Sequence, residues 1–165
     1  MDALGVGDGS VVADLGAGNG YFTIRLAKRV GPNGIVFAED VQRQMIEAIT
    51  RRVDKIGLKN VITVRGTVTN PRLPKPVDAV LIVGAFHEMD QPIVLLGNVA
   101  KSLKPTGLVG IVDFKKAGGG PGPAMEERPD PEVVIGHARA AGLVLRSRET
   151  FLRYQYMLVF ERPRQ

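Results

Sequence analysis

Residues 11–22 read VVADLGAGNGYF and are the most informative part of the sequence. An apolar run leads into an acid, glycines follow at alternate positions, and a helix-forming segment begins directly after them. Glycine at a strand-to-helix turn leaves the backbone open to a ligand, and the N–H groups at a helix start attract an anionic group. We therefore expect a strand over residues 10–15, a nucleotide-binding turn, and a helix over residues 21–30.

Apolar runs of strand length alternate with amphipathic stretches of helix length along the rest of the chain. Further strands are expected at residues 34–39, 61–65, 77–83 and 108–113, and further helices at 42–56, 92–103 and 131–141, with 104–107 as a turn. Two β-rich segments at residues 143–150 and 155–161 predict an antiparallel hairpin. Residues 117–129, rich in glycine and proline, predict a mobile loop. The order indicates an α/β fold with a largely parallel sheet and helices on both faces.

The composition predicts one domain over residues 1–165, because this length suits one core and is too short for two ordinary domains. The sequence has neither a membrane-length apolar run nor a signal-like leader, so we expect a cytoplasmic protein without membrane contact. Without Cys and with two His, a metal centre is not expected. The net charge of +5 suits an anionic partner, but the scattered Lys and Arg favour a solvated basic surface over a nucleic-acid site.

The spacing of the glycines argues against a dinucleotide, because the third glycine of G-x-G-x-x-G would fall on Tyr21. Asp14 stands two residues before the first glycine, where a carboxylate suits a ligand ammonium group. S-Adenosylmethionine carries an ammonium and a carboxylate at one end, so it fits this turn. A turn that only packs the helix against the strand is the structural alternative.

An acid at the tip of the second strand is the other half of the predicted site. Asp40 lies twenty residues beyond Gly20, where a carboxylate can accept hydrogen bonds from both ribose hydroxyls. Glu39 is the alternative, but alternation along a strand predicts that only one of the two acids faces the ligand. We choose Asp40.

The segments VVADLGAGNGYF, VFAEDV, VDAVLIVGAFHEMDQP and LKPTGLVGIVDF resemble the successive motifs of class I S-adenosylmethionine-dependent methyltransferases. The closing segment AAGLVLRSRETFLRYQYMLVFERP is similar to the C-terminal helix and hairpin of small bacterial members with a type 11 or type 25 domain. The resemblance implies a Rossmann-like seven-stranded sheet, with only the last strand antiparallel and the cofactor across the strand tips.

The resemblance also implies roles for individual residues. It assigns the methionine end of the cofactor to Asp14, Gly16, Ala17 and Gly18, the ribose to Asp40 and Val41, the adenine to Thr67 and Val68, and the floor beneath the sulfonium to Gly84. Thr67 departs from the family pattern, which often has an acid there, and Thr106 replaces a glycine of a common turn. Few residues precede the first strand, where relatives usually carry a helical lid, so we expect an open site or a homodimer whose partner roofs it.

The acceptor side offers His87 and Glu88, which follow the fourth strand near the reacting methyl group. A His there can take a proton from an oxygen or nitrogen nucleophile, although a structural role for both residues is the alternative. Tyr21 is a further candidate for contact with cofactor or acceptor, with a packing role as its alternative.

The sequence thus predicts transfer of a methyl group from S-adenosylmethionine to a small-molecule acceptor, leaving S-adenosylhomocysteine. Methyl transfer asks the protein mainly to align and desolvate the nucleophile, so no catalytic triad is required. Three alternatives stay open: an RNA or protein methyltransferase, a non-catalytic cofactor-binding subunit, and the disfavoured NAD-dependent oxidoreductase.

Overall fold

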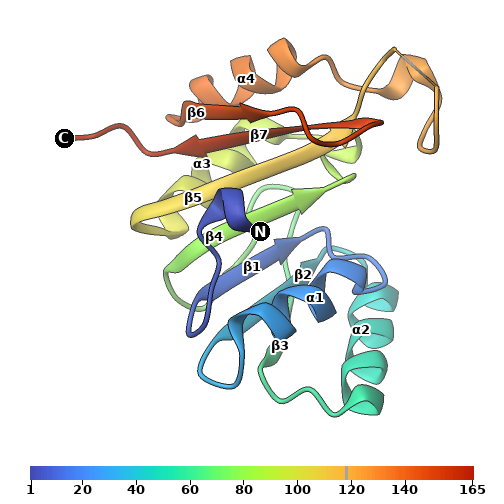
Figure 1. Ribbon diagram of the computed structural model, residues 1–165, viewed down its shortest axis with the longest axis vertical. Helices are drawn as coiled ribbons and strands as arrows, with labels where there is room; N and C mark the ends of the chain where they lie inside the picture. The colour runs from blue at the N-terminus through green and yellow to red at the C-terminus, as the bar shows by residue number, and fades with distance from the viewer. Residues whose placement is uncertain (118) are drawn as a thin grey trace.

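A computed structural model describes residues 1–117 and 119–165 as a seven-stranded sheet with helices on both faces (Figure 1). Its strands are β1 (Val11–Leu15), β2 (Ile35–Asp40), β3 (Val61–Arg65), β4 (Val77–Val83), β5 (Leu103–Phe114), β6 (Val144–Glu149) and β7 (Gln155–Glu161). Its α-helices are α1 (Tyr21–Val30), α2 (Arg43–Ile56), α3 (Pro92–Ser102) and α4 (Pro131–Ala140), and its 3-10 helices are η1 (Asp2–Leu4), η2 (Phe86–Glu88) and η3 (Met125–Glu127). The predicted fold class is confirmed.

The strand order is β3-β2-β1-β4-β5-β7-β6. β1 pairs in parallel with both β2 and β4, while β7 runs antiparallel to both β5 and β6. Only β7 therefore runs against the other strands, as expected. The chain leaves β3 at one edge and returns beside β1, so the strand order reverses between β1 and β4.

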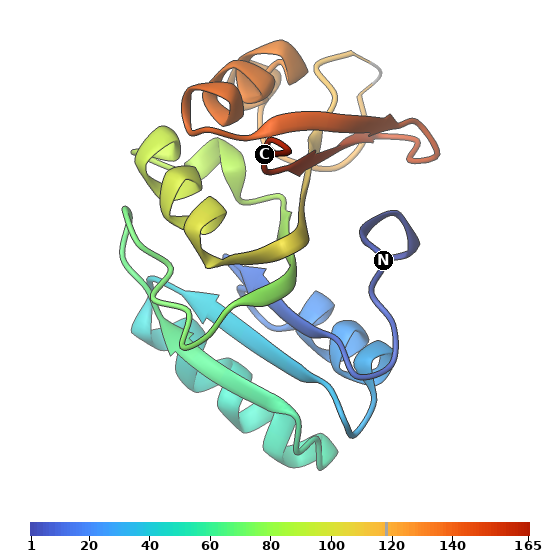
Figure 2. The ribbon, with the colours of Figure 1, turned by 90° about the vertical axis from the view of Figure 1, so that its left-hand side faces the viewer.

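The two faces of the sheet are covered by different parts of the chain (Figure 2). Val12 of β1 packs with α1 and η1, whereas the next residue, Ala13, packs with α3 and α4 on the opposite face. Side chains alternate across a strand, so an apolar run such as β1 is buried on both sides. α2 lies over β2, where Ile49 and Val53 contact Ala38.

The ends of several helices follow the sequence signals. Gly57 ends α2 in the left-handed conformation, with φ 81°, and Asp130 caps α4 by accepting a hydrogen bond from the Glu132 backbone N–H. One boundary differs, because residues 104–107 belong to β5 rather than to a separate turn. Leu103 is buried and pairs with Val77 ahead of a register shift, which lengthens the strand.

The glycine- and proline-rich loop is organised around Arg128, which is buried. Its guanidinium donates hydrogen bonds to the backbone carbonyls of Lys115, Gly119, Pro121 and Pro123. The structure thus gives this part of the predicted mobile loop a defined path; Gly118, within the same prediction, lies outside the described residues. Among the helices of the described ranges, none combines the length and apolar character needed to cross a bilayer.

Candidate cofactor and acceptor site

A cleft of about 520 Å³ opens at the carboxyl ends of β1, β2 and β4. Ligands of open parallel sheets bind at this edge, where the strand order reverses. The residues predicted for the site that line the cleft are Gly16, Gly18, Asp40, Val41, Thr67, Val68, Gly84 and Glu88. The structure therefore brings together most of the predicted site from four separate parts of the chain.

The turn after β1 needs glycine for two different reasons. Gly16 has φ 66°, and a Cβ atom there would lie 2.7 Å from the Cβ of Ala85 at the tip of β4. Gly18 has φ 57°, but a Cβ there would approach only the Gly16 carbonyl oxygen, at 4.0 Å. Gly16 thus allows the turn to lie against β4, whereas Gly18 supplies backbone freedom and leaves the cleft open.

Asp40 ends β2 and is hydrogen-bonded to the glycine turn. Its Oδ2 accepts a hydrogen bond from the Gly18 backbone N–H at 3.0 Å, and its Oδ1 accepts one from Gln42 at 2.9 Å. Each carboxylate oxygen has a second lone pair, so both oxygens keep the capacity to accept from a ligand hydroxyl.

Glu39 lines the cleft beside Asp40, which differs from the expectation that only one acid faces it. Both reach it because each carboxylate is hydrogen-bonded to the glycine turn, Glu39 to the Gly16 N–H and Asp40 to the Gly18 N–H. Glu39 Oε2 accepts the Gly16 backbone N–H at 3.2 Å. Burial raises the pKa of Glu39 to about 8; the Gly16 hydrogen bond opposes this change, and the charges of Asp40 and Asp14 add to it.

Asp14 lies beneath the turn and does not line the cleft. Its Oδ2 accepts a hydrogen bond from the Thr23 hydroxyl of α1 at 2.7 Å. Burial raises the pKa of Asp14 to about 7, against the hydrogen bond from Thr23. Asp14 therefore places a titratable carboxyl group directly behind the glycine turn.

The wall opposite the glycine turn is apolar. Val41 and Val68 line the cleft with 41% and 45% of their surface exposed, so both present open apolar surface to it. Thr67 uses its hydroxyl oxygen to accept the Asn70 backbone N–H at 3.0 Å, which closes the turn after β3. A carboxylate, a glycine turn and two apolar walls suit a nucleoside with a charged amino-acid end.

Besides Asp14, two other residues predicted to contact the cofactor do not line the cleft. Tyr21 is half exposed at the start of α1, with the Arg25 guanidinium 3.5 Å from its ring centre and Phe22 at its edge. Ala17 donates its backbone N–H to the Glu39 carbonyl oxygen at 2.9 Å. Both have local packing or hydrogen-bonding partners in the structure.

On the acceptor side, His87 is held by an aspartate that sequence reasoning missed. Asp113, at the end of β5, has no exposed surface, and its carboxylate oxygens lie 3.2 and 3.3 Å from His87 Nδ1. His87 Nε2 lies 3.7 Å from Glu88 Oε1, and Glu88 lines the cleft. In the sequence, Asp113 could have been noticed as an acid that follows the apolar run of β5, the strand next to β4.

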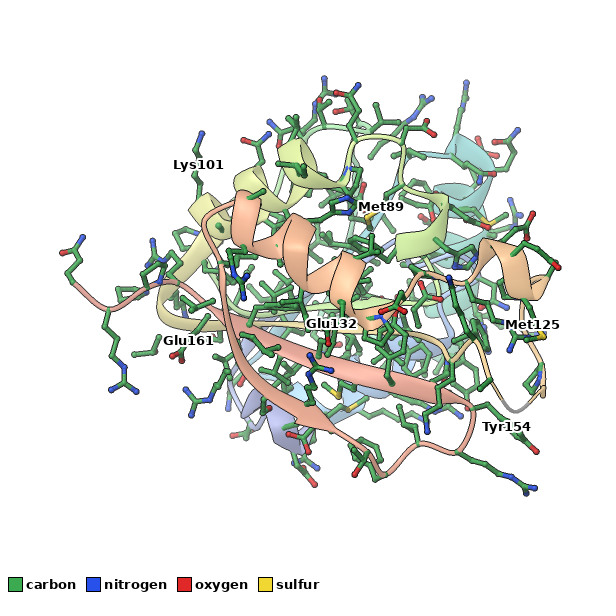
Figure 3. All side chains as sticks on the ribbon, turned by 90° about the horizontal axis from the view of Figure 1, so that it is seen from above. Met89, Lys101, Met125, Glu132, Tyr154 and Glu161 are labelled. Atoms are coloured by element: carbon green, nitrogen blue, oxygen red, sulfur yellow. The ribbon has the colours of Figure 1, made fainter. Side chains whose placement is uncertain are left out.

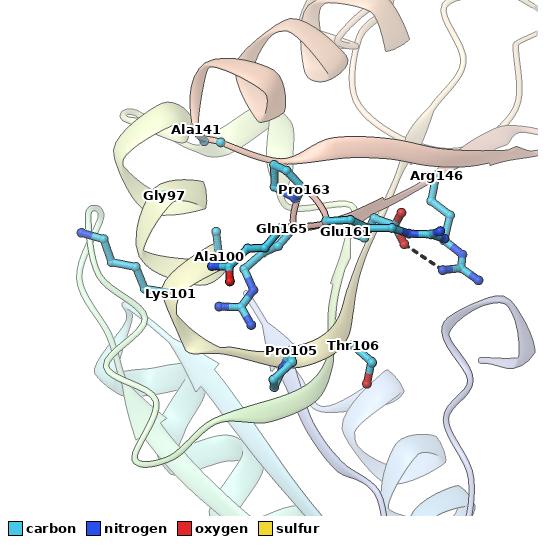
Figure 4. A pocket seen from close by; sticks show the side chains of 13 residues that line it. Gly97, Ala100, Lys101, Pro105, Thr106, Ala141, Arg146, Glu161, Pro163 and Gln165 are labelled. Carbon is cyan, nitrogen blue, oxygen red and sulfur yellow. Dashed lines mark hydrogen bonds and ion pairs between the residues drawn. The ribbon is translucent and has the colours of Figure 1, made fainter.

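A second cavity, of about 1060 Å³, lies at the opposite edge of the sheet (Figure 4). Lys101, Arg146 and Arg164 line it, and Arg146 pairs with Glu161 at 2.8 Å. Figure 3 shows Lys101 and Glu161 at one end of the molecule and Met125 at the other. Although larger, this cavity lies away from the glycine turn after β1 and from the acids at the end of β2, so it is not the candidate site.

Comparison with known proteins agrees with this geometry. Residues 12–107 match the sequence model of the methyltransferase domain family. A crystal structure of a SAM-dependent methyltransferase from Aquifex aeolicus is similar with a TM-score of 0.90 and 30% identity, covering 96% of this chain and 85% of that one.

Two curated relatives match over shorter parts of their length. The ubiquinone/menaquinone biosynthesis C-methyltransferase UbiE of Pasteurella multocida is 29% identical over 70% of this chain and 44% of its own. The demethylmenaquinone methyltransferase of Lactobacillus johnsonii is 30% identical over 67% of this chain and 46% of its own. This chain thus spans less than half the length of either relative. The match over residues 12–107, the Aquifex structure and the glycine-turn cleft together place the chain in the methyltransferase domain family.

Proposed function

We propose that this protein binds S-adenosylmethionine in the strand-tip cleft and transfers its methyl group to a small-molecule acceptor. The observation that carries the proposal is the meeting of the Gly16–Gly18 turn with the Asp40 carboxylate in one cleft. S-Adenosylmethionine supplies a methyl group already activated by its sulfonium, so the chain's own task is alignment and exclusion of water.

Each part of the cleft suits one part of the nucleoside. Asp40 accepts the ribose hydroxyls, and Val41 and Val68 flank the adenine beside Thr67. The glycine turn holds the amino-acid end, with Asp14 and Ala17 supporting it from behind, and Gly84 leaves room beneath the sulfur. His87 and Glu88 act on the acceptor side.

The cleft has the size of a small-molecule site, and the names of the relatives favour a small acceptor. A volume of about 520 Å³ falls within the range typical of small-molecule sites. The names of the two curated relatives refer to ubiquinone, menaquinone and demethylmenaquinone. These names support a small organic acceptor for this chain without specifying which one.

Calorimetry with the Asp40→Ala variant tests the proposed cofactor site. We expect the wild type to bind S-adenosylmethionine and S-adenosylhomocysteine but not NAD, and the variant to bind both roughly 10–100-fold more weakly, since it loses a charged acceptor. Asp54→Ala, which removes an exposed acid of α2, is the matched control and should bind like the wild type. Equal affinity of Asp40→Ala and wild type would refute the ribose assignment, and tight NAD binding would refute the function.

A nucleic-acid acceptor is the second candidate, favoured by the basic side chains Lys101, Arg146 and Arg164 around the second cavity. A single-stranded RNA oligonucleotide should then bind with an affinity that falls steeply with salt. Arg164→Gln should weaken that binding without altering affinity for S-adenosylmethionine. RNA binding that is affected neither by salt nor by Arg164→Gln would exclude this candidate.

A further inference from the structure

The His87 ring is fixed by a buried carboxylate on the neighbouring strand. Asp113 Oδ2 accepts the His87 backbone N–H at 3.2 Å, and Oδ1 accepts the Phe114 backbone N–H at 2.8 Å. The same two oxygens lie 3.2 and 3.3 Å from Nδ1 of the ring. Both the main chain and the side chain of His87 are therefore oriented by Asp113.

The groups around this pair leave the carboxylate to His87. Tyr156 stands opposite Asp113 on β7, but its hydroxyl donates to the Pro129 carbonyl oxygen at 2.9 Å. His137 of α4 packs beside Phe86 with ring centres 6.0 Å apart, and Glu88 is a charged neighbour of the His87 ring. An ionised carboxylate only accepts hydrogen bonds, so Nδ1 must carry the proton of the neutral ring and Nε2 keeps its lone pair.

Nε2 is directed toward the cleft side of the pair. It lies 3.7 Å from Glu88 Oε1, which is longer than a hydrogen bond. The Glu88 side chain is 74% exposed and lines the cleft, so it can turn into solvent and leave Nε2 to an acceptor. The Glu88 side chain therefore separates the unprotonated Nε2 atom from the cleft.

We propose that Asp113 is the positioning residue that makes His87 Nε2 a general base, and that the acceptor is a phenol-like hydroxyl compound. The proposal rests on the proposed methyltransferase function. A hydroxyl group becomes a strong nucleophile only as it loses its proton, so it benefits from a fixed base. An aryl amine attacks through a lone pair it already has, and a thiol ionises readily near neutral pH, so neither needs this arrangement.

The proposed step transfers a methyl group to the acceptor and a proton to His87. The hydroxyl oxygen forms a bond to the methyl carbon using its own electrons, its proton passes to His87 Nε2, and the departing sulfur keeps the electrons of the broken S–C bond. His87 becomes positively charged next to Asp113, which stabilises that charge. The ring then returns the proton to solvent.

The tautomer of His87 is tested without any acceptor, by ¹⁵N NMR of the imidazole nitrogens in the full chain. The sequence has two His, so a His137→Gln variant assigns the signals. We expect the neutral ring of the wild type to carry its proton on Nδ1. Asp113→Asn, which keeps the shape but donates an amide hydrogen to Nδ1, should move the proton to Nε2. A wild-type ring protonated on Nε2 would overturn the proposal.

Turnover with three matched probes, 4-methylphenol, 4-methylthiophenol and 4-methylaniline, then separates a base from a structural residue. We expect methylation of the phenol, with kcat reduced roughly 10²–10⁴-fold in both Asp113→Asn and His87→Gln while affinity for S-adenosylmethionine is unchanged. The acidic limb of the kcat–pH profile should disappear in His87→Gln.

The remaining outcomes separate this proposal from the function itself. Turnover of the thiol or the amine but not the phenol overturns the hydroxyl class, as does binding of S-adenosylmethionine without turnover of any probe. Phenol turnover that Asp113→Asn and His87→Gln leave unchanged overturns the base. Failure of the wild type to bind S-adenosylmethionine overturns the proposed function. The tautomer measurement needs no cofactor, so its result is separate from that failure.

Discussion

At the scale of single residues, Glu39 makes the stability of the protein depend on pH. Its carboxyl group is buried against the Gly16 N–H and close to Asp40, and its pKa is about 8 instead of the ordinary 4.5. Between these two pH values the folded protein keeps a proton that the unfolded chain has lost. The free energy of unfolding therefore falls as pH rises through this window and levels off above it.

Replacing Glu39 with Gln should flatten that dependence. Gln keeps an oxygen that accepts the Gly16 N–H but carries no titratable proton. Between pH 5.5 and pH 8.5, the free energy of unfolding of Glu39→Gln should fall by about 1 kcal/mol or more less than that of the wild type. Urea denaturation at the two pH values measures this difference. Part of the pH dependence of the free energy of unfolding should remain in the variant, because Asp14 also has a raised pKa, of about 7. Glu126→Gln, at an exposed site, is the control; an identical slope in the wild type and Glu39→Gln would contradict the assignment.

At the scale of an element, the turn after β1 combines a backbone requirement with a contact. Both Gly16 and Gly18 have positive φ, but only Gly16 lies against another element, at Ala85. A left-handed conformation costs a non-glycine residue about 1–2 kcal/mol. Overlap with Ala85 adds to that cost at one position and not at the other.

The two alanine variants of the turn form a matched pair. We expect Gly18→Ala to lose about 1 kcal/mol of stability and Gly16→Ala at least about 2 kcal/mol, because only the latter must push β1 away from β4. Urea denaturation measures both, and calorimetry with S-adenosylmethionine should show the larger loss of affinity in Gly16→Ala. If Gly16→Ala and Gly18→Ala lower the free energy of unfolding equally, the overlap with Ala85 has no energetic cost.

The elements themselves could be read from the sequence because their signals are local. Periodicity and capping residues predicted nearly every strand and helix, and the glycine turn with Asp40 predicted the cleft. What could not be read depends on contacts between distant residues. The extension of β5 needs Leu103 to pair with Val77, and Asp113 meets His87 only after β4 and β5 align. Glu39 was set aside on the alternation of side chains along β2, but its hydrogen bond with the distant Gly16 N–H brings it to the cleft.

At the scale of the whole molecule, charge is separated along the strands. Asp40, Glu88 and Asp90 line the cleft at one edge of the sheet, while Lys101, Arg146, Arg162 and Arg164 line the cavity at the other. S-Adenosylmethionine carries a net positive charge, whereas S-adenosylhomocysteine carries none. The acidic edge therefore favours the methyl donor over its product even though the chain as a whole is basic.

Salt should reduce this preference. Raising ionic strength from about 20 mM to about 500 mM screens the acids at the cleft, so we expect affinity for S-adenosylmethionine to fall roughly two- to threefold. Affinity for the neutral S-adenosylhomocysteine should change less, and calorimetry at both salt concentrations compares the two. If both ligands respond alike, the acids do not discriminate between them by charge.

The position of β7 between β5 and β6 has a consequence for how the chain assembles. β6 has its hydrogen-bonding partner in β7, which comes later in the sequence, so the edge of the sheet stays open until residues 155–161 fold back along β5. The inserted strand thus acts as the closing step of assembly, and losing it would detach β6 from the sheet and remove the contacts that α4 makes with β7. A chain interrupted before residue 155 would expose the unpaired backbone edge of β5 to self-association.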